Sequence, residues 1–288
     1  MNQANSIAGR GIPPEALEVM KRIDARRRNF NRNIKISLAV MVALLVLGLV
    51  VLGLDFKFMA KWLGFILTGL GFTLLVSVLA ISLACVLSVI GALGRLSRNP
   101  IFNAMATLYV SLIRGTPLLV QVYMWYLALP QIGGALQELG FVGIQKYLTL
   151  PAIPAGIMAL AVCYGAYMTE TVRAGIQSIK IGQNEAAKAL GMTSAQTMRR
   201  VIFPQALRVI IPPVSNDFLA MVKDSSLVSL MGVLELSFRA IKIGRRYFQS
   251  LEMLIMVAVI YWVMCIILQT VQEKIETHMA RGERGENG

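Results

Sequence analysis

Residues 62–94 read WLGFILTGLGFTLLVSVLAISLACVLSVIGALG, and no charged side chain interrupts them. A run of about 18 or more apolar residues is long enough to cross a bilayer as a helix, whereas a buried helix of a soluble protein is shorter and keeps a polar face. Further stretches without Asp, Glu, Lys or Arg occupy 36–54, 115–137, 147–169 and 253–272. The chain is 56% hydrophobic and 15% charged, against about 25% charged for an ordinary soluble domain. The sequence therefore predicts an all-α membrane protein.

These stretches predict six transmembrane helices. The second is too long for one upright helix, so we expect its start near Trp62 to lie in the membrane interface. The third contains Arg114 and Pro117, and proline removes a backbone donor, so we expect this span to be kinked or broken. The six predicted crossings are 36–54, 64–93, 103–130, 153–174, 203–222 and 252–272.

The distribution of lysine and arginine predicts the orientation of the chain, because loops rich in these residues stay in the cytoplasm. With the N-terminus inside, the basic N-terminal segment 1–35, the loop between the fourth and fifth spans and the tail 273–288 hold more Lys and Arg than the outer loops. We therefore expect both termini in the cytoplasm. A basic cluster at 239–246 falls on the outer side and argues mildly against this orientation, unless it is a docking surface.

Several function classes are disfavoured by composition. The net charge of +13 does not predict nucleic-acid binding, because the basic residues lie beside the spans rather than on one soluble face. Cys85, Cys163 and Cys265 lie apart in apolar stretches, and the single histidine, His278, lies in the charged tail, so neither a disulfide framework nor a metal site is expected. No phosphate-binding loop of the form GxxxxGK[ST] occurs, so this chain does not bind ATP by that route. We expect no catalytic residue, metal or cofactor in this chain.

The longest polar stretch between spans, 180–200, contains recognisable helix signals. Gly182 follows the fourth span and is expected to end that helix. Residues 184–190 are rich in strong helix formers, and Gly191 fits the left-handed position after a helix. Thr193, with a glutamine three residues later, forms a capping box that starts a new helix leading into the fifth span. The stretch therefore predicts a short helix, a glycine turn and a second helix on the cytoplasmic side.

This loop also carries a family resemblance. It contains Glu185-Ala186-Ala187, then Gly191, then Val201-x-Phe203-Pro204, and this pattern resembles the "EAA" loop of permease subunits of ATP-binding-cassette importers. The flanking motifs are similar to those of the polar amino-acid branch, which comprises histidine, glutamine, glutamate, arginine and opine permeases. These motifs are RGTPLLVQ at 114–121, GAY at 165–167, RAGIQSI at 173–179, PQALR at 204–208 and KDSSLV at 223–228.

The resemblance covers about residues 64–272 and implies a five-helix core. The importer-permease domain is then 62–272, its coupling loop is 180–203, and the helix 36–54 is one extra N-terminal span. Lys180 departs from the family, which often has proline there.

The resemblance also implies roles for the loop and partners for the chain. The coupling residues Glu185, Ala186, Ala187 and Gly191 are expected to dock into a cytoplasmic ATPase dimer that binds the ATP. The two alanines permit close approach, Glu185 offers a charge-assisted contact at the helix start, and Gly191 aims the helix. The other implied partners are a second permease copy or a sister permease, an extracytoplasmic amino-acid-binding protein and the lipid bilayer. Without the flanking motifs, the loop would equally suit an ordinary amphipathic connector.

Charged residues inside predicted spans are costly, by roughly 2.5–3.5 kcal/mol at a span centre, so they need a partner or a wet cavity. Candidate residues of a substrate path are Arg114 for a carboxylate, Asp217 or Glu170 for an ammonium, and Tyr164 with Gly165, a glycine expected to loosen the fourth span. For Glu170, an i,i+3 ion pair with an arginine on the same helix is the favoured interpretation. Asp217 is the sharper candidate, because two prolines just before it should distort the helix.

Three alternatives to an amino-acid importer permease remain. A gradient-driven secondary transporter would work without an ATPase and would usually show inverted repeats and intramembrane ion ligands. A membrane-embedded enzyme would need a convergent nucleophile or metal constellation, which the sequence does not show. A cassette importer for another small solute would differ only in the flanking motifs.

Overall fold

The computed structural model describes residues 14–284, and the chain divides between Phe56 and Lys57 into two compact units. Every regular element in the described residues is helical, which confirms the all-α prediction. The first unit contains α2 (Pro14–Val51), a single helix that includes residues 14–35 of the basic segment and most of the predicted first span, while residues 1–13 of that segment lie outside the described residues. After its first residue this helix contains no proline and only one glycine, so nothing interrupts it before Gly53, whose φ is 62°.

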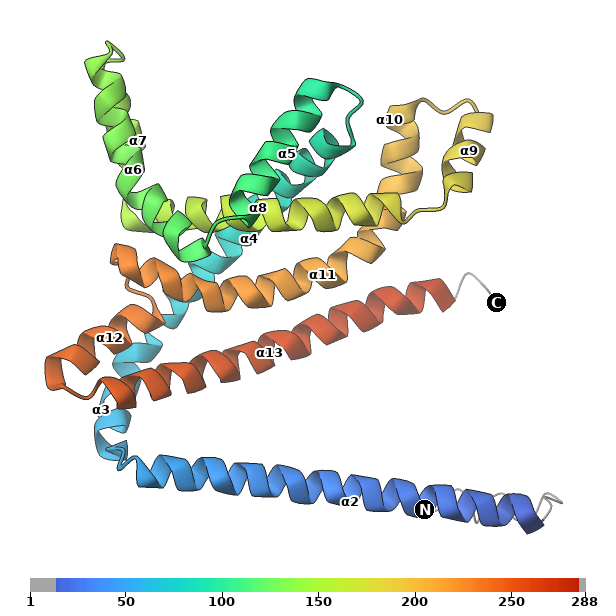
Figure 1. Ribbon diagram of the computed structural model, residues 1–288, viewed down its shortest axis with the longest axis vertical. Coiled ribbons are helices and arrows are strands. Elements are labelled where there is room, and N and C mark those ends of the chain that lie inside the picture. Colours follow the sequence, from blue (N-terminus) through green and yellow to red (C-terminus); the bar gives the residue numbers. More distant parts are fainter. Residues whose placement is uncertain (1–13, 285–288) are drawn as a thin grey trace. The chain divides into compact units, whose positions relative to one another are not determined.

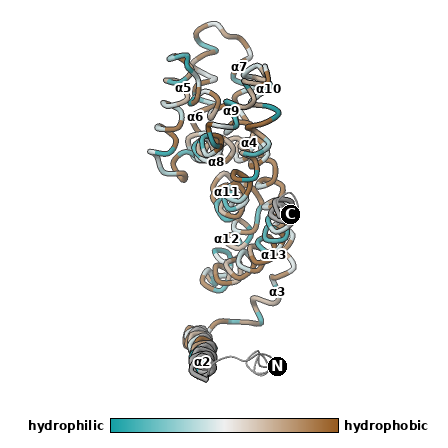
Figure 2. Tube along the Cα trace, turned by 90° about the vertical axis from the view of Figure 1, so that its right-hand side faces the viewer, coloured by the Kyte–Doolittle hydropathy of each residue, from teal (hydrophilic) through white to brown (hydrophobic). Residues whose placement is uncertain are grey.

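The second unit contains the remaining helices. They are α3 (Phe56–Leu67), α4 (Leu70–Leu96), α5 (Pro100–Arg114), α6 (Leu118–Glu138), α7 (Ile144–Leu148), α8 (Ala152–Gln177), α9 (Ile181–Ala189), α10 (Ser194–Thr197), the π-helical turn η1 (Met198–Ile202), α11 (Phe203–Asp224), the 3₁₀-helix η2 (Ser225–Met231), α12 (Leu236–Tyr247) and α13 (Ser250–Arg284). Figure 1 shows α8, α11 and α13 with roughly parallel axes, α11 running opposite to the other two, with α9 and α10 at one end and α12 at the other. Hydrophilic residues gather around α9 and α10 (Figure 2).

Helix α8 is the centre of the second unit, because α4, α5, α6 and α11 all pack against it. Small residues allow this close approach. A Cβ atom on Gly91 of α4 would lie 2.3 Å from Thr169 Oγ1, and one on Gly175 of α8 would lie 2.3 Å from Ile210 Cγ1 of α11. Side chains longer than hydrogen would therefore push α4 and α11 away from α8.

Three described helices are long and apolar enough to cross a membrane: Leu70–Leu96, Ala152–Gln177 and Ser250–Thr277. The pair α5 and α6 meets the same criterion if it is taken as one bent span. The predicted number of six crossings is therefore not confirmed. The fifth predicted span is a continuous helix, α11, which contains two charged residues inside the predicted bounds and two more at its end, and it does not meet the criterion.

Glycine and proline explain why two predicted spans are each divided into two helices, which was expected for 103–130 but not for 64–93. The stretch 64–93 is not one helix, since α3 and α4 are separate around Gly69, where a Cβ atom would lie 2.8 Å from the backbone of Glu235. The stretch 103–130 was expected to break, and α5 and α6 are bent by 108° at the Gly115–Pro117 segment. In contrast, α11 runs through Pro212 and Pro213 without a break, so the distortion expected before Asp217 does not interrupt the helix.

Candidate functional site

The connector between α8 and α11 has the shape that its sequence predicts, with one error. Helix α8 ends at Gln177 and α9 begins at Ile181, so Gly182 lies inside α9 and does not end the preceding helix. Because α9 starts earlier than predicted, Glu185 lies in its second turn rather than at its start. The expected favourable position of Glu185 at the positive end of the helix dipole is therefore lost.

The end of α9 is fixed by a Schellman motif. Gly191 adopts a φ of 76° and donates its N–H to the Lys188 carbonyl at 2.9 Å, while Met192 N–H donates to the Ala187 carbonyl at 3.1 Å. Thr193 then opens α10 with the predicted capping box, in which its hydroxyl accepts from the Gln196 N–H. The predicted glycine turn and helix start are both confirmed.

The coupling residues divide into exposed and buried positions. Glu185 and Ala186 are exposed, whereas Ala187 is buried inside its own chain and cannot contact a partner directly. The sequence analysis missed two large apolar side chains at the ends of α9, since Ile181 is 76% and Leu190 83% exposed. The sequence did contain a signal for this surface, because Ile181 and Leu190 are large apolar residues in the longest polar loop. Together with Glu185 and Ala186 they give α9 a mixed apolar and charged surface.

Glu170 forms an ion-pair cluster near the α9 end of α8. Arg173 Nη2 lies 2.6 Å from one carboxylate oxygen of Glu170, and Arg95 Nε of α4 lies 3.1 Å from the other. The pair with Arg173 confirms the i,i+3 interpretation, while Arg95 was not predicted because it is 75 residues away. Both oxygens have cationic partners, so Glu170 holds α4 against α8 and is a poor candidate for binding an ammonium group.

A second polar cluster lies where α8 meets the end of α11. The Tyr164 hydroxyl donates to Asp224 Oδ2 at 2.8 Å, and the ring of Tyr164 lies 6.1 Å from that of Tyr167. The Arg114 guanidinium, at the end of α5, lies 5.8 Å from the Tyr167 ring. Asp217 is half-buried on α11. Neither aspartate has a cationic partner among the described residues.

This cluster includes three of the predicted path residues, Arg114, Tyr164 and Asp217, and adds Asp224. The sequence placed Asp224 just beyond the fifth predicted span, and only its contact with a tyrosine 60 residues away shows that it belongs here. Gly165 is different, because a Cβ atom there would lie 2.9 Å from both Leu87 Cβ and the Tyr109 hydroxyl. Gly165 therefore allows α8 to pack closely against α4 and α5. Helix α8 is continuous at this glycine, so the expected loosening of the helix is not observed.

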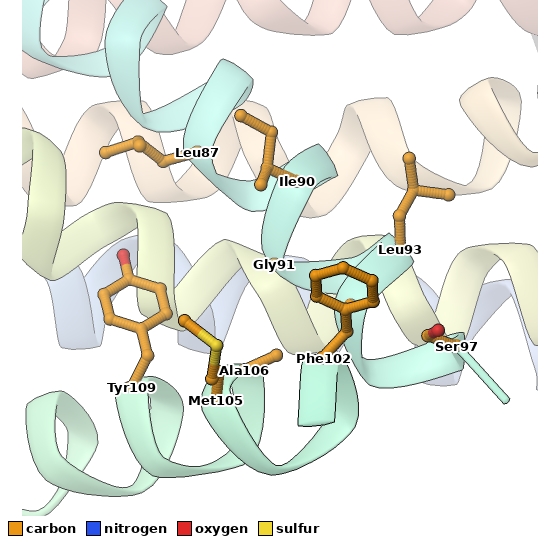
Figure 3. A pocket seen from close by; sticks show the side chains of 10 residues that line it. Leu87, Ile90, Gly91, Leu93, Ser97, Phe102, Met105, Ala106 and Tyr109 are labelled. Carbon is orange, nitrogen blue, oxygen red and sulfur yellow. The ribbon is translucent and has the colours of Figure 1, made fainter. Parts of the chain in front are cut away.

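The chemistry of the cluster suits a zwitterion. A guanidinium can bind a carboxylate through two parallel hydrogen bonds, and an unpaired carboxylate can accept from an ammonium group. By comparison, the hollow of about 530 Å³ between α4 and α5 is lined mainly by Leu, Ile, Phe, Met and Ala side chains (Figure 3), so it offers little to orient a polar ligand. Within the described part of the chain, no group of three or more His, Cys, Asp or Glu residues could hold a metal ion.

Comparison with known proteins gives consistent matches. The family model described as "Binding-protein-dependent transport system inner membrane component" matches residues 84–281. A probable amino-acid ABC transporter permease of Vibrio harveyi is 38% identical over 221 residues, covering 77% of this chain and 94% of the relative. The L-cystine transport system permease of Bacillus subtilis is also 38% identical, over 74% of this chain and 86% of the relative. A crystal structure of an amino acid ABC transporter with histidines aligns with a TM-score of 0.67 and 36% identity, covering 78% of this chain and 99% of that one.

Proposed function

The chain belongs to the family of binding-protein-dependent transport system inner membrane components, and from this premise we propose that it is the membrane-spanning subunit of an ATP-driven importer for a polar or charged amino acid. The observation that carries the proposal is α9, an exposed helix with a fixed end that connects α8 to α11. The cargo class is supported by the relatives described as amino-acid, L-cystine and arginine permeases.

In this proposal α9 transmits the work of a separate cytoplasmic ATPase. Leu190 and Ile181 would bury apolar surface against the ATPase, while Glu185 would make a charge-assisted hydrogen bond that fixes the register. ATP binding would draw the ATPase pair together and move α9, and hydrolysis would reset it. This chain would hydrolyse no ATP itself.

The cargo would pass the cluster of Arg114, Tyr164, Asp217 and Asp224. The arginine would face the α-carboxylate of the amino acid, and one of the aspartates would face its ammonium group. The chain would reverse access to this cluster from one side of the membrane to the other, together with a second copy or a sister permease. A soluble binding protein would deliver the cargo at the face opposite α9, with both termini of this chain in the cytoplasm.

The test is to purify the tagged chain gently from its native membrane and identify the proteins that accompany it. Wild-type chain should recover a P-loop ATPase in stoichiometric amount, and Glu185→Arg should lose it because a charge reversal opposes the docked register. Lys146→Glu reverses an exposed charge on α7, outside the coupling loop, and serves as the matched control. Recovery of no nucleotidase, with solute transport still intact in vesicles, would instead establish a gradient-driven transporter.

A further inference from the structure

Helix α12 is sharply divided into an apolar face and a basic face. Leu236, Ala240, Ile243 and Gly244 are buried, and the first three pack in a core cluster with residues of α3, α11 and α13. Lys242, Arg245 and Arg246 are exposed. At 100° per residue these three cations fall on one side of the helix, opposite the buried residues. The helix is therefore fixed to the fold by one face and presents positive charge on the other.

Within residues 14–284, none of these three cations has an anionic partner. Two ion pairs of the second unit join Glu170 to Arg95 and Arg173, at the other end of α8, and neither involves α12. Arg239, also on α12, differs because its Nε donates to the Leu234 carbonyl at 2.9 Å. Its guanidinium lies 5.0 Å from the Phe65 ring, and that of Arg246 lies 5.9 Å from the Tyr247 ring.

The cations line a hollow of about 820 Å³ between α6, η2 and α12. Tyr123 of α6 and Ser229 of η2 contribute polar groups to the same hollow. Helix η2 begins directly after Asp224, so the hollow adjoins the chain segment that carries the acidic end of the proposed cargo path. Helix α12, which contributes the cations of this hollow, lies at the opposite end of the second unit from α9 (Figure 1).

Neither the helix nor the membrane accounts for this arrangement. The negative end of a helix attracts cations in its last turn, which explains Arg245 and Arg246 but not Lys242. Membrane proteins disfavour clustered Lys and Arg on the outer side. A concave site that adjoins the cargo path is also better placed for a soluble partner than for lipid, which needs an outward-facing surface.

We infer that the basic face of α12, with the hollow beside it, docks an acidic surface of the soluble binding protein that delivers the cargo. The inference rests on the proposed function, because it requires an importer with a binding protein. Complementary charge across such an interface speeds encounter and fixes orientation, and its effect falls with ionic strength. The partner is thus a protein whose Asp and Glu side chains surround the opening from which cargo is released.

The experiment uses the permease assembled with its ATPase in nanodiscs of neutral phosphatidylcholine. Purified extracytoplasmic amino-acid-binding proteins of the source organism are added singly, and the one that stimulates ATP hydrolysis becomes the probe. Its dissociation constant is measured at low and high salt for wild type and for the combined variant Lys242→Glu, Arg245→Glu and Arg246→Glu. Lys146→Glu, on the exposed side of α7 and outside the hollow, is the matched control.

We expect the combined variant to weaken binding by about tenfold or more at low salt, to lose most of the salt dependence and to keep unstimulated ATP hydrolysis. The control and the charge-conserving variant Arg245→Lys with Arg246→Lys should bind within about twofold of wild type. An unchanged dissociation constant would overturn the inference. This includes the outcome in which native mass spectrometry shows that the variant has lost bound anionic lipid while its affinity for the binding protein is unchanged. If no binding protein stimulates hydrolysis by wild type, the proposed function itself fails.

Discussion

The glycine after α9 provides a direct test of the coupling proposal. Gly191 has a φ of 76°, and a Cβ atom there would meet no atom within 4 Å. Substitution by alanine therefore causes no clash, and its cost is the left-handed conformation alone, roughly 1–2 kcal/mol. Gly182 lies inside the same helix and also has open space around its Cβ position. Alanine there should favour the helix by about 1 kcal/mol.

The two substitutions should therefore have opposite effects on docking. If α9 docks as the preformed helix, Gly191→Ala should weaken ATPase binding by about 5- to 30-fold, since about 1.4 kcal/mol corresponds to a factor of ten. Gly182→Ala should leave binding unchanged or strengthen it by up to about fivefold. Gly191→Asn should bind nearly as well as wild type, because asparagine tolerates the left-handed conformation.

The assay measures the dissociation constant of the purified ATPase for each variant in nanodiscs, with circular dichroism as a check on folding. Equal affinities for wild type and Gly191→Ala would refute the argument that the Schellman motif aims α9. Equal weakening by Gly191→Ala and Gly182→Ala would show that close contact at the glycines, rather than backbone conformation, matters.

Three further predictions concern the body of the permease. Glu170→Gln leaves two arginines without their carboxylate. Because these side chains are only partly buried, we expect a loss of about 1–3 kcal/mol of stability, seen as a lower melting temperature in detergent. An unchanged melting curve would mean that the cluster is only a surface contact. Gly175→Ala should destabilise by about 1–3 kcal/mol because its Cβ would lie 2.3 Å from Ile210, whereas Gly71→Ala, with open space, should not; equal melting temperatures would contradict the close packing. Burial raises the pKa of the Glu235 carboxyl, although the hydrogen bonds to this group act in the opposite direction. The folded state therefore holds the proton more tightly than the unfolded chain does. The stability that the bound proton contributes is lost as the pH rises through the raised pKa. Glu235→Gln should flatten that decline in melting curves between about pH 4 and about pH 8, and an identical slope would assign the pH dependence to other groups.

Local signals in the sequence were sufficient to predict several helix ends and one helix break. The left-handed Gly191, the capping box at Thr193 and the break between α5 and α6 depend on residues within a few positions of one another. Gly182 was misread because a glycine near a helix end is as compatible with the interior of the next helix as with a stop. The choice is made by packing of the connector against η1 and by a Gln205–Gln183 contact of 3.3 Å, neither of which is local.

The polar clusters could only be predicted in part, because each depends on which helices become neighbours. Sequence spacing identified the pair of Glu170 with the arginine one turn away, but not Arg95 on another helix. Likewise, the sequence selected Tyr164 as a candidate, but not its partner Asp224. Helix α11, whose apolar residues alternate with charged, polar and proline residues, also falls below a criterion based on mean hydropathy. Its charges are tolerated where neighbouring helices or water solvate them.

The same packing explains how an event at α9 can reach the distant polar cluster. Helix α9 is joined to α8 by a short turn and to α11 through α10 and η1. Helices α8 and α11 pack closely where the Ile210 side chain lies against Gly175, which has no side chain of its own. At 1.5 Å per residue the 22 residues of α11 span roughly 33 Å, so a tilt at its η1 end displaces Asp224 at the other end. Because the Tyr164–Asp224 hydrogen bond joins α8 to that far end, any relative movement of the two helices must stretch or break it. The polar cluster therefore changes when α9 moves one helix relative to the other, which is the property that an alternating-access site requires.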